Sequence, residues 1–141
     1  MNLDDIYGIL SSNGYKLTKQ RKILLDILIK YPNLFLSAED IQKKAEDKNF
    51  HLDLSTIYRT INIFDNVNLI CKTQKDGSNL YKIRTTKKHH HHLICKKCGK
   101  AVSFDFCPSD IFNHIAEKNG FVLVEDKIEL YGYCNKCSNT L

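Results

Sequence analysis

Two pairs of cysteines in the second half of the chain have a spacing that suits a metal ion. Each pair has the form Cys-x-x-Cys, and together they comprise Cys95, Cys98, Cys134 and Cys137. Four thiolates form the ligand set of a closed tetrahedral structural zinc site, and both sulfurs of so short a motif can reach one ion. A redox dithiol or unpaired buried cysteines are the alternatives. The pattern predicts a structural Zn²⁺ that holds the C-terminal end of the chain in place.

A run of four histidines, His89 to His92, lies shortly before the first cysteine pair. In an extended segment alternate side chains face opposite ways, so His90 and His92 share one face and His89 and His91 share the other. One run can therefore supply two metal sites. Imidazole suits zinc, iron, nickel and copper alike, so the run alone does not choose the metal. A solvated polar loop is the alternative.

The composition is that of a folded protein. The chain has 141 residues, 43% of them hydrophobic, which allows one ordinary core or two small ones. No apolar stretch approaches the roughly 20 residues that span a bilayer, and Asp4 and Asp5 near the start are unlike a signal peptide. We therefore expect a cytoplasmic protein without a membrane partner, whose six cysteines are reduced and bind metal rather than form disulfides.

The positive charge is concentrated in the first part of the chain. The formal net charge is +5, and residues 1–88 contain 15 Lys and Arg against 10 Asp and Glu, whereas residues 89–141 contain 6 of each. Such a balance attracts polyanions such as DNA. A basic surface that only keeps the protein soluble is the alternative.

The first part has the pattern of a winged helix. Helical spacing of apolar residues and capping residues predict four helices, over 2–13, from Thr18 to about residue 30, from Ser37 and from Ser55. Two strand-like runs, 69–73 and 79–84, follow with a turn at Asp76-Gly77. Helices followed by a hairpin make a winged helix, predicted here over residues 1–84. The alternative is a small helical domain with an incidental hairpin.

The second part is predicted to be a separate small domain. Residues 85–88 contain no apolar side chain and are expected to form a hinge, followed by a domain over 89–141. Strand-like runs lie at 92–94, 101–104, 121–124 and 127–133, and a helix is expected over 109–118. The expected fold class is α+β, with an N-terminal winged helix and a small α/β domain that contains a Cys₄ zinc site.

Several motifs together resemble the ferric uptake regulator family over nearly the whole chain. They are His-His-His-His-Leu-Ile-Cys-x-x-Cys-Gly, Glu-Leu-Tyr-Gly-Tyr-Cys-x-x-Cys, and the segments 14–21, 37–41 and 55–60. The resemblance implies a metal-sensing regulator of transcription that is not an enzyme. It also implies a homodimer paired through its C-terminal halves, whose metal-loaded form binds AT-rich operators in double-stranded DNA and usually represses.

The helix predicted from Ser55 carries groups suited to DNA. Its first residues offer hydroxyl, phenol and guanidinium groups, at the end where a recognition helix enters the major groove. The resemblance implies that Tyr58 contacts bases or backbone and that Lys16 approaches the minor groove. The expected DNA-binding set is Lys16, Arg21, Ser55, Thr56, Tyr58 and Arg59. The alternative is that Tyr58 packs in the core and Arg59 is solvated.

The chain departs from the family's iron and peroxide sensors at three ligand positions. Phe35 stands where those sensors have a histidine, Lys82 or Arg84 where they have an acid or cysteine, and Ser103 where they have an acid. None of these side chains suits a ferrous ion. The departures argue against the standard ferrous site of the family.

A different regulatory site is expected from Cys71, His90 and His92. This set resembles that of the zinc uptake regulators, in which an aspartate takes the place of Cys71. A thiolate with imidazoles favours Zn²⁺, although Fe²⁺ or Mn²⁺ remains open at this point. Cys107 or water could be the fourth ligand. Cys71 and Cys107 could instead be small buried hydrophobes.

An additional site is expected on the other face of the histidine run. The resemblance matches Asp110 and Asp126 to a carboxylate and a histidine ligand of the family, and His89 and His91 would join them. Two solvated acids are the alternative. Taken together, the sequence favours a zinc-responsive repressor. An iron- or peroxide-responsive regulator of the same family is the main alternative, and a metal-storage or trafficking protein is a remote one.

Overall fold

The computed structural model describes residues 2–84 and 89–139. The predicted hinge at 85–88 lies outside the described residues. The chain divides into two compact units, Met1–Lys87 and Lys88–Leu141, called unit 1 and unit 2 below. Among the described residues, no helix is long and apolar enough to cross a membrane.

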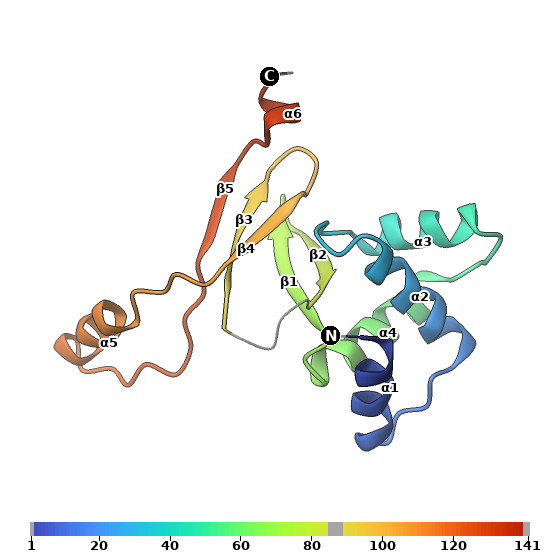
Figure 1. Cartoon of the computed structure of the whole chain (residues 1–141), viewed down its shortest axis with the longest axis horizontal. Coiled ribbons are helices and arrows are strands. Elements are labelled where there is room, and N and C mark those ends of the chain that lie inside the picture. The colour runs from blue at the N-terminus through green and yellow to red at the C-terminus, as the bar shows by residue number, and fades with distance from the viewer. Residues whose placement is uncertain (1, 85–88, 140–141) are drawn as a thin grey trace. The chain divides into compact units, whose positions relative to one another are not determined.

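Unit 1 contains four helices followed by a two-stranded antiparallel hairpin (Figure 1). The elements are α1 (Leu3–Ser12), α2 (Lys19–Lys30), α3 (Ala38–Asp47), α4 (Leu54–Asn66), β1 (Ile70–Lys75) and β2 (Ser78–Ile83). This is the winged helix that the sequence predicts. The two-residue turn of the hairpin has positive φ at both Asp76 (51°) and Gly77 (80°), as the turn chemistry requires.

Side-chain caps determine where the helices begin. Thr18 accepts a hydrogen bond from the backbone N–H of Arg21, and Ser37 from that of Asp40, so two predicted helix starts are confirmed. The fourth helix starts at Leu54, one residue before the start predicted at Ser55, and its cap lies two residues before Ser55. Asp53 is the cap, and its Oδ1 accepts from the backbone N–H of Thr56 at 2.8 Å. The Ser55 hydroxyl donates to the same oxygen, so Ser55 supports the cap from inside the helix.

Unit 1 has a well-formed hydrophobic core between its helices and hairpin. The fully buried side chains come from all four helices and from the residue before β1. They include Leu10, which is 1% exposed, and Leu25, Ile27, Ile41, Ile57, Phe64 and Leu69, each 0% exposed. Burying one side chain of this kind contributes about 1.5–3 kcal/mol. The described part of unit 1 therefore holds enough apolar burial to fold around its own core.

Unit 2 is built on a three-stranded sheet with strand order β4-β3-β5. Its elements are β3 (His91–Cys95), β4 (Ala101–Phe104), α5 (Ser109–Lys118), β5 (Glu129–Gly132) and a short α6 (Asn135–Ser138). The central strand β3 pairs antiparallel with β4 and parallel with β5 (Figure 1). The parallel pairing sets Cys95 opposite Gly132, which brings the second cysteine pair to the end of β3.

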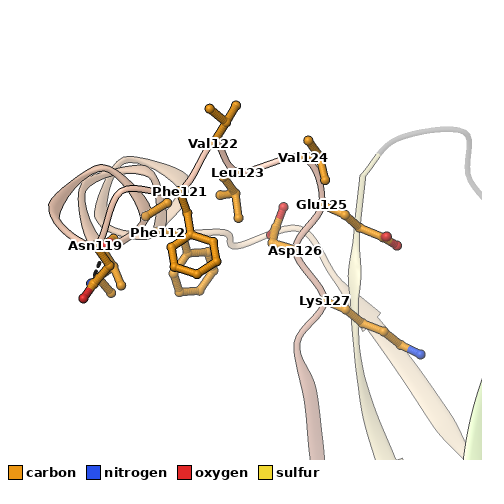
Figure 2. A pocket seen from close by; sticks show the side chains of 11 residues that line it. Phe112, Asn119, Phe121, Val122, Leu123, Val124, Glu125, Asp126 and Lys127 are labelled. Atoms are coloured by element: carbon orange, nitrogen blue, oxygen red, sulfur yellow. Dashed lines mark hydrogen bonds between the residues drawn. The ribbon is translucent and has the colours of Figure 1, made fainter.

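The strand predicted over 121–124 is absent, although its apolar residues alternate as expected. Figure 2 shows Phe121 and Leu123 turned one way and Val122 and Val124 the other. Within the described residues of unit 2 no strand pairs with this segment. Val122 is 88% exposed and Val124 is 93% exposed. A strand needs a hydrogen-bonding neighbour, and residues 2–84 and 89–139 provide none for this segment.

Candidate metal centres and nucleic-acid interface

The four cysteines of the two Cys-x-x-Cys motifs converge at the end of β3. One ligand sulfur from each of Cys95, Cys98, Cys134 and Cys137 lies within 4.8 Å of the others. The Cys98 and Cys134 sulfurs are 3.8 Å apart, and the backbone N–H of Cys134 donates to the Cys95 sulfur at 3.4 Å. Among the described residues, the cysteines form no disulfide. The sulfur set fits a tetrahedral zinc ion that would join the β3–β4 turn to the segment after β5.

The surroundings of this cluster separate the pKa values of its thiols. Burial raises the pKa of Cys95, but backbone N–H groups, first that of Cys98, outweigh burial and lower it to about 6. The backbone N–H of Cys137 lowers the pKa of Cys134. Burial and its three neighbouring thiols raise the pKa of Cys137 to about 12. The site thus favours thiolates at Cys95 and Cys134, which are the form that binds metal.

The histidine run alternates as predicted from an extended strand. The rings of His89 and His91 lie 4.6 Å apart, and those of His90 and His92 lie 4.7 Å apart, each pair in a T-shaped arrangement. His91 and His92 belong to β3 and are buried. The first two residues of β3 and the two residues before it therefore present two separate pairs of imidazoles, one on each side.

A second cluster forms around the carboxylate of Asp126. Its Oδ2 lies 3.1 Å from His89 Nε2 and 3.4 Å from His91 Nε2, and the Cys107 thiol donates to it at 3.0 Å. One ligand atom from each of these four residues lies within 4.8 Å of the others, and the group is called the Asp126 cluster below. The hydrogen bond between Cys107 and Asp126 raises the pKa of the thiol and lowers that of the carboxyl.

Two details of the Asp126 cluster differ from the sequence-based expectation. Asp110 is exposed in the first turn of α5 and does not belong to the group, whereas Cys107, which precedes α5, does. Cys107 was expected as a possible fourth ligand beside Cys71, and its bond to Asp126 places it elsewhere. The turn at 105–108 decides both outcomes, and its path has no signature in the sequence.

A polar cavity of about 500 Å³ in unit 1 gathers three of the expected DNA-binding residues. Arg21 from α2 and Thr56 and Arg59 from α4 line it. Arg59 donates to the Thr56 hydroxyl at 3.3 Å, and Arg21 donates to the backbone oxygen of Lys16 at 2.7 Å. Thr18, Gln20 and Asn62 also line this cavity and were not expected from the sequence.

The other expected DNA-binding residues lie on the surface of the same unit. Lys16 and Ser55 are exposed, and Tyr58 is 43% exposed on α4, so Tyr58 is not a core residue. Two guanidinium groups beside the first turns of α2 and α4 offer donors that suit phosphate oxygens.

Comparison with known proteins agrees with this arrangement. The model of the ferric uptake regulator family matches residues 12–131. This chain belongs to the ferric uptake regulator family. Its members are DNA-binding, metal-responsive transcription regulators, which act as homodimeric repressors and not as enzymes.

Individual members are similar to this chain over nearly their whole length. The ferric uptake regulation protein of Staphylococcus aureus is 34% identical over 139 residues, which cover 99% of this chain and 100% of that protein. The Vibrio cholerae ferric uptake regulator is 30% identical, with a TM-score of 0.71, and the match covers 92% of this chain and 100% of that one. The Helicobacter pylori regulator, described with three functional metal binding sites, is 27% identical, with a TM-score of 0.69 and coverage of 96% and 91%.

Phe35 and Lys82, two residues named above where the sequence departs from the iron sensors, lie close together in unit 1. Lys82 is 1% exposed, its Nζ donates to the backbone oxygen of Ile83 at 3.3 Å, and it lies 6.0 Å from the centre of the Phe35 ring. Burial lowers the pKa of this ammonium group. An ammonium group and a phenyl ring thus lie together at positions that cannot bind a cation.

Cys71 lies in unit 1, on β1, where it is buried and pairs in register with Lys82. His90 and His92 lie in unit 2. The regulatory site expected from these three residues therefore draws on both units, and it stays a prediction.

Proposed function

We propose that this chain is a cytoplasmic, zinc-responsive repressor that binds AT-rich DNA as a homodimer. The observation that carries the proposal is the convergence of metal ligands on β3, which ends in Cys95 and presents imidazoles on both faces. Sulfur and nitrogen donors predominate in these groups, and such donors favour zinc over harder ions. The contact between Lys82 and Phe35 supports the same preference, because the chain cannot use those positions for iron.

The two parts of the chain would have separate roles. Residues 1–84 would bind DNA, 85–88 would act as a hinge, and 89–141 would bind metal and pair with a second copy. In the DNA-bound dimer α4 would enter the major groove with Ser55, Thr56, Tyr58 and Arg59. Lys16 and Arg21 would contact the backbone or the adjacent minor groove.

The metal response would come from Cys71, His90 and His92. An ion bound by all three would tie the hairpin of the winged helix to unit 2, with water as the fourth ligand because Cys107 is bonded to Asp126. The ion would thereby select one arrangement of the two winged helices, the one that matches successive half-sites on DNA. The opposite face, with His89, His91 and Asp126, would form the additional site.

The apolar surface of unit 2 supports pairing with a second copy of this chain. Phe112, Ile115, Phe121 and Leu123 line a cavity of about 610 Å³ between α5 and the segment after it (Figure 2). Five large apolar residues here are more than half exposed: Ile111, Ile115, Phe121, Val122 and Val124. Apolar surface concentrated in this way is typical of a dimer interface. The unpaired segment 121–124 would gain its missing contacts there.

An iron-responsive repressor is the second candidate. The relatives in Staphylococcus aureus and Vibrio cholerae are named for ferric uptake, at 34% and 30% identity. The carboxylate of Asp126 also suits a harder ion. The same DNA-binding experiment separates the two candidates.

Protein whose only bound metal is the zinc of the cysteine cluster is expected to bind operator DNA weakly, and to bind it tightly once further zinc is added. The measurement is fluorescence anisotropy of a duplex selected from random DNA, at fixed salt, with buffered free zinc, manganese or anaerobic iron. Coupling energies of this kind typically change affinity about 5–150-fold. Activation by iron at a lower free concentration than zinc would favour the second candidate, and equal binding with and without a chelator would refute a metal-dependent regulator.

Arg59→Ala and Tyr58→Ala are expected to weaken operator binding without changing metal content or dimerisation. Both side chains are exposed on α4 and lie outside the metal-bearing unit. Loss of a base contact by Arg59 should cost about 1–3 kcal/mol, whereas loss of a phosphate contact should make the salt dependence shallower by about one counterion. Lys48→Ala, an exposed cation in the same unit, is the control of equal charge. Unchanged affinity in both variants would exclude α4 as the recognition helix.

A further inference from the structure

We infer that Cys107 is a metal ligand and that the Asp126 cluster holds a zinc-like divalent ion through a thiolate, imidazoles and a carboxylate. This inference deepens the proposed function and rests on it, because the site has a role in the cell only if the protein responds to metal. Neither the family resemblance nor the sequence pattern placed Cys107 here. The resemblance pointed instead to Asp110, which lies exposed on α5 outside the group.

The first argument is the convergence of donors from separate segments. Cys107 comes from the connection between β4 and α5, and Asp126 from the segment before β5. His91 is the first residue of β3, and His89 lies two residues before it. All their contacts meet at one oxygen, Asp126 Oδ2, at 3.0 Å from Cys107, 3.1 Å from His89 and 3.4 Å from His91. The cluster thus joins chain segments 19 and 37 residues apart.

The second argument is the buried nitrogen of His91. The side chain is 1% exposed, and its Nε2 points toward Asp126 without a hydrogen-bond partner in the described part of the chain. Its other nitrogen, Nδ1, accepts the backbone N–H of Ile128 at 3.0 Å. Because Nδ1 accepts in this tautomer, Nε2 carries the ring proton and directs it toward Asp126 Oδ2, 3.4 Å away. The buried ring is therefore held beside the carboxylate at the centre of the cluster, and it can bind a metal ion only in the other tautomer.

The proton balance shows which ligands carry the binding. The ion displaces one proton from the Cys107 thiol, whereas the Asp126 carboxylate offers lone pairs directly, and an imidazole such as His89 binds through its unprotonated ring nitrogen. His91 is more costly, because Nε2 can bind only after its proton moves to Nδ1 and the contact with Ile128 is exchanged. We therefore expect His89, Cys107 and Asp126 to provide most of the affinity, and His91 to complete four-coordination.

The donor set also selects the class of metal. One thiolate, two imidazoles and one carboxylate suit the tetrahedral coordination of zinc or cobalt(II). Manganese(II) prefers oxygen-rich octahedral sites, so the thiolate of Cys107 disfavours it. Cys107 is then the residue that makes this cluster selective for softer ions.

Cobalt(II) spectroscopy of the full chain tests the inference. The experiment uses a Cys71→Ser background with one equivalent of zinc in the cysteine cluster, so that Cys107 is the one thiol of the six cysteines left for added cobalt. Cobalt should produce thiolate-to-metal charge-transfer absorption that saturates at one added ion per chain. Adding Cys107→Ser should remove this absorption and weaken cobalt binding about 10–100-fold or more. Asp110→Asn is the matched control and should change neither the absorption nor the cobalt affinity. Asp126→Asn should weaken binding but keep the absorption.

Two results would overturn the inference: charge-transfer absorption that persists in the Cys107→Ser variant, or cobalt affinity that depends on Asp110 and not on Cys107. Zinc retained at one ion per chain and an unchanged circular dichroism spectrum show that the variants are folded. No DNA is present, so the outcome is independent of whether the chain is a metal-dependent repressor. Failure of the operator-binding experiment with a positive cobalt result would defeat the proposed function and leave this site intact.

Discussion

Replacing Cys95 by serine is expected to release the structural zinc and to unfold unit 2, while unit 1 stays folded. Among the described residues of unit 2, the buried hydrophobic side chains are Ile94, Cys95, Ala101 and Ala116, too few for an independent core. Zinc binding to a structural site contributes about 10–16 kcal/mol to folding, which is far more than this core can supply. The extensive core lies entirely in unit 1, which should therefore keep its helical signal.

Zinc per chain by mass spectrometry, thermal unfolding and molecular mass in solution check this prediction together. The zinc content should fall from one to none, the dimer should be lost, and one of two unfolding transitions should disappear. Cys71→Ser is the matched control, because Cys71 is a buried cysteine outside the cluster and should keep the structural zinc. A Cys95→Ser protein that remains dimeric, folded and zinc-loaded would show that the cluster is not a structural site.

Replacing both His90 and His92 by alanine is expected to abolish the effect of metal on DNA binding and to spare the structural zinc. These two rings lie together on one side of the histidine run, and their removal takes two of the three ligands of the proposed regulatory site. The ratio of DNA affinities with and without zinc should fall from about 5–150 to about 1. Binding anisotropy of the selected operator, with zinc content measured in parallel, gives both readouts.

The control is a double variant of two exposed histidines outside the run, His51→Ala with His114→Ala, which should respond to zinc normally. Cys71→Ser should weaken the response in the same direction as the His90 and His92 variant. The opposite outcome would be a normal zinc response in the His90 and His92 double variant and a lost response when His89 and His91 are replaced. That outcome would assign the sensory function to the Asp126 cluster. The hinge mechanism would then be discarded.

The fold was predictable where a local pattern determines the structure. Helix α5 and strand β4 have the predicted bounds, since the spacing of apolar residues and the stop at Asn119-Gly120 fix them. The start of α4 was misplaced because Ser55 and Asp53 are both good caps, and only the geometry shows that Asp53 accepts the hydrogen bond. Segment 121–124 has the alternation of a strand, but a strand also needs a pairing neighbour, and the described part of the chain contains none for it.

The metal sites, like the fold, were predictable where a local sequence pattern determines them. Two short Cys-x-x-Cys motifs bring pairs of sulfurs together by local geometry, and the parallel pairing of β3 with β5 brings one pair to the other. The Asp126 cluster instead depends on where the turn at 105–108 and the segment after α5 run. Family resemblance therefore suggested Asp110, and the three-dimensional path of the turn puts Cys107 beside Asp126.

The central position of β3 has a consequence for how metal ions load the protein. One five-residue strand carries Cys95, His91 and His92, so a ligand from each of the three proposed sites is fixed to the same stretch of backbone. An ion bound at one site would restrict the motion of that strand, at a cost in conformational entropy. The next ion would bind to a strand that is already ordered, so its binding would cost less entropy. Loading of the three proposed sites would thereby be cooperative even without a change in average structure. Such a protein would respond over a narrower range of free metal concentration than one whose sites lie on separate elements.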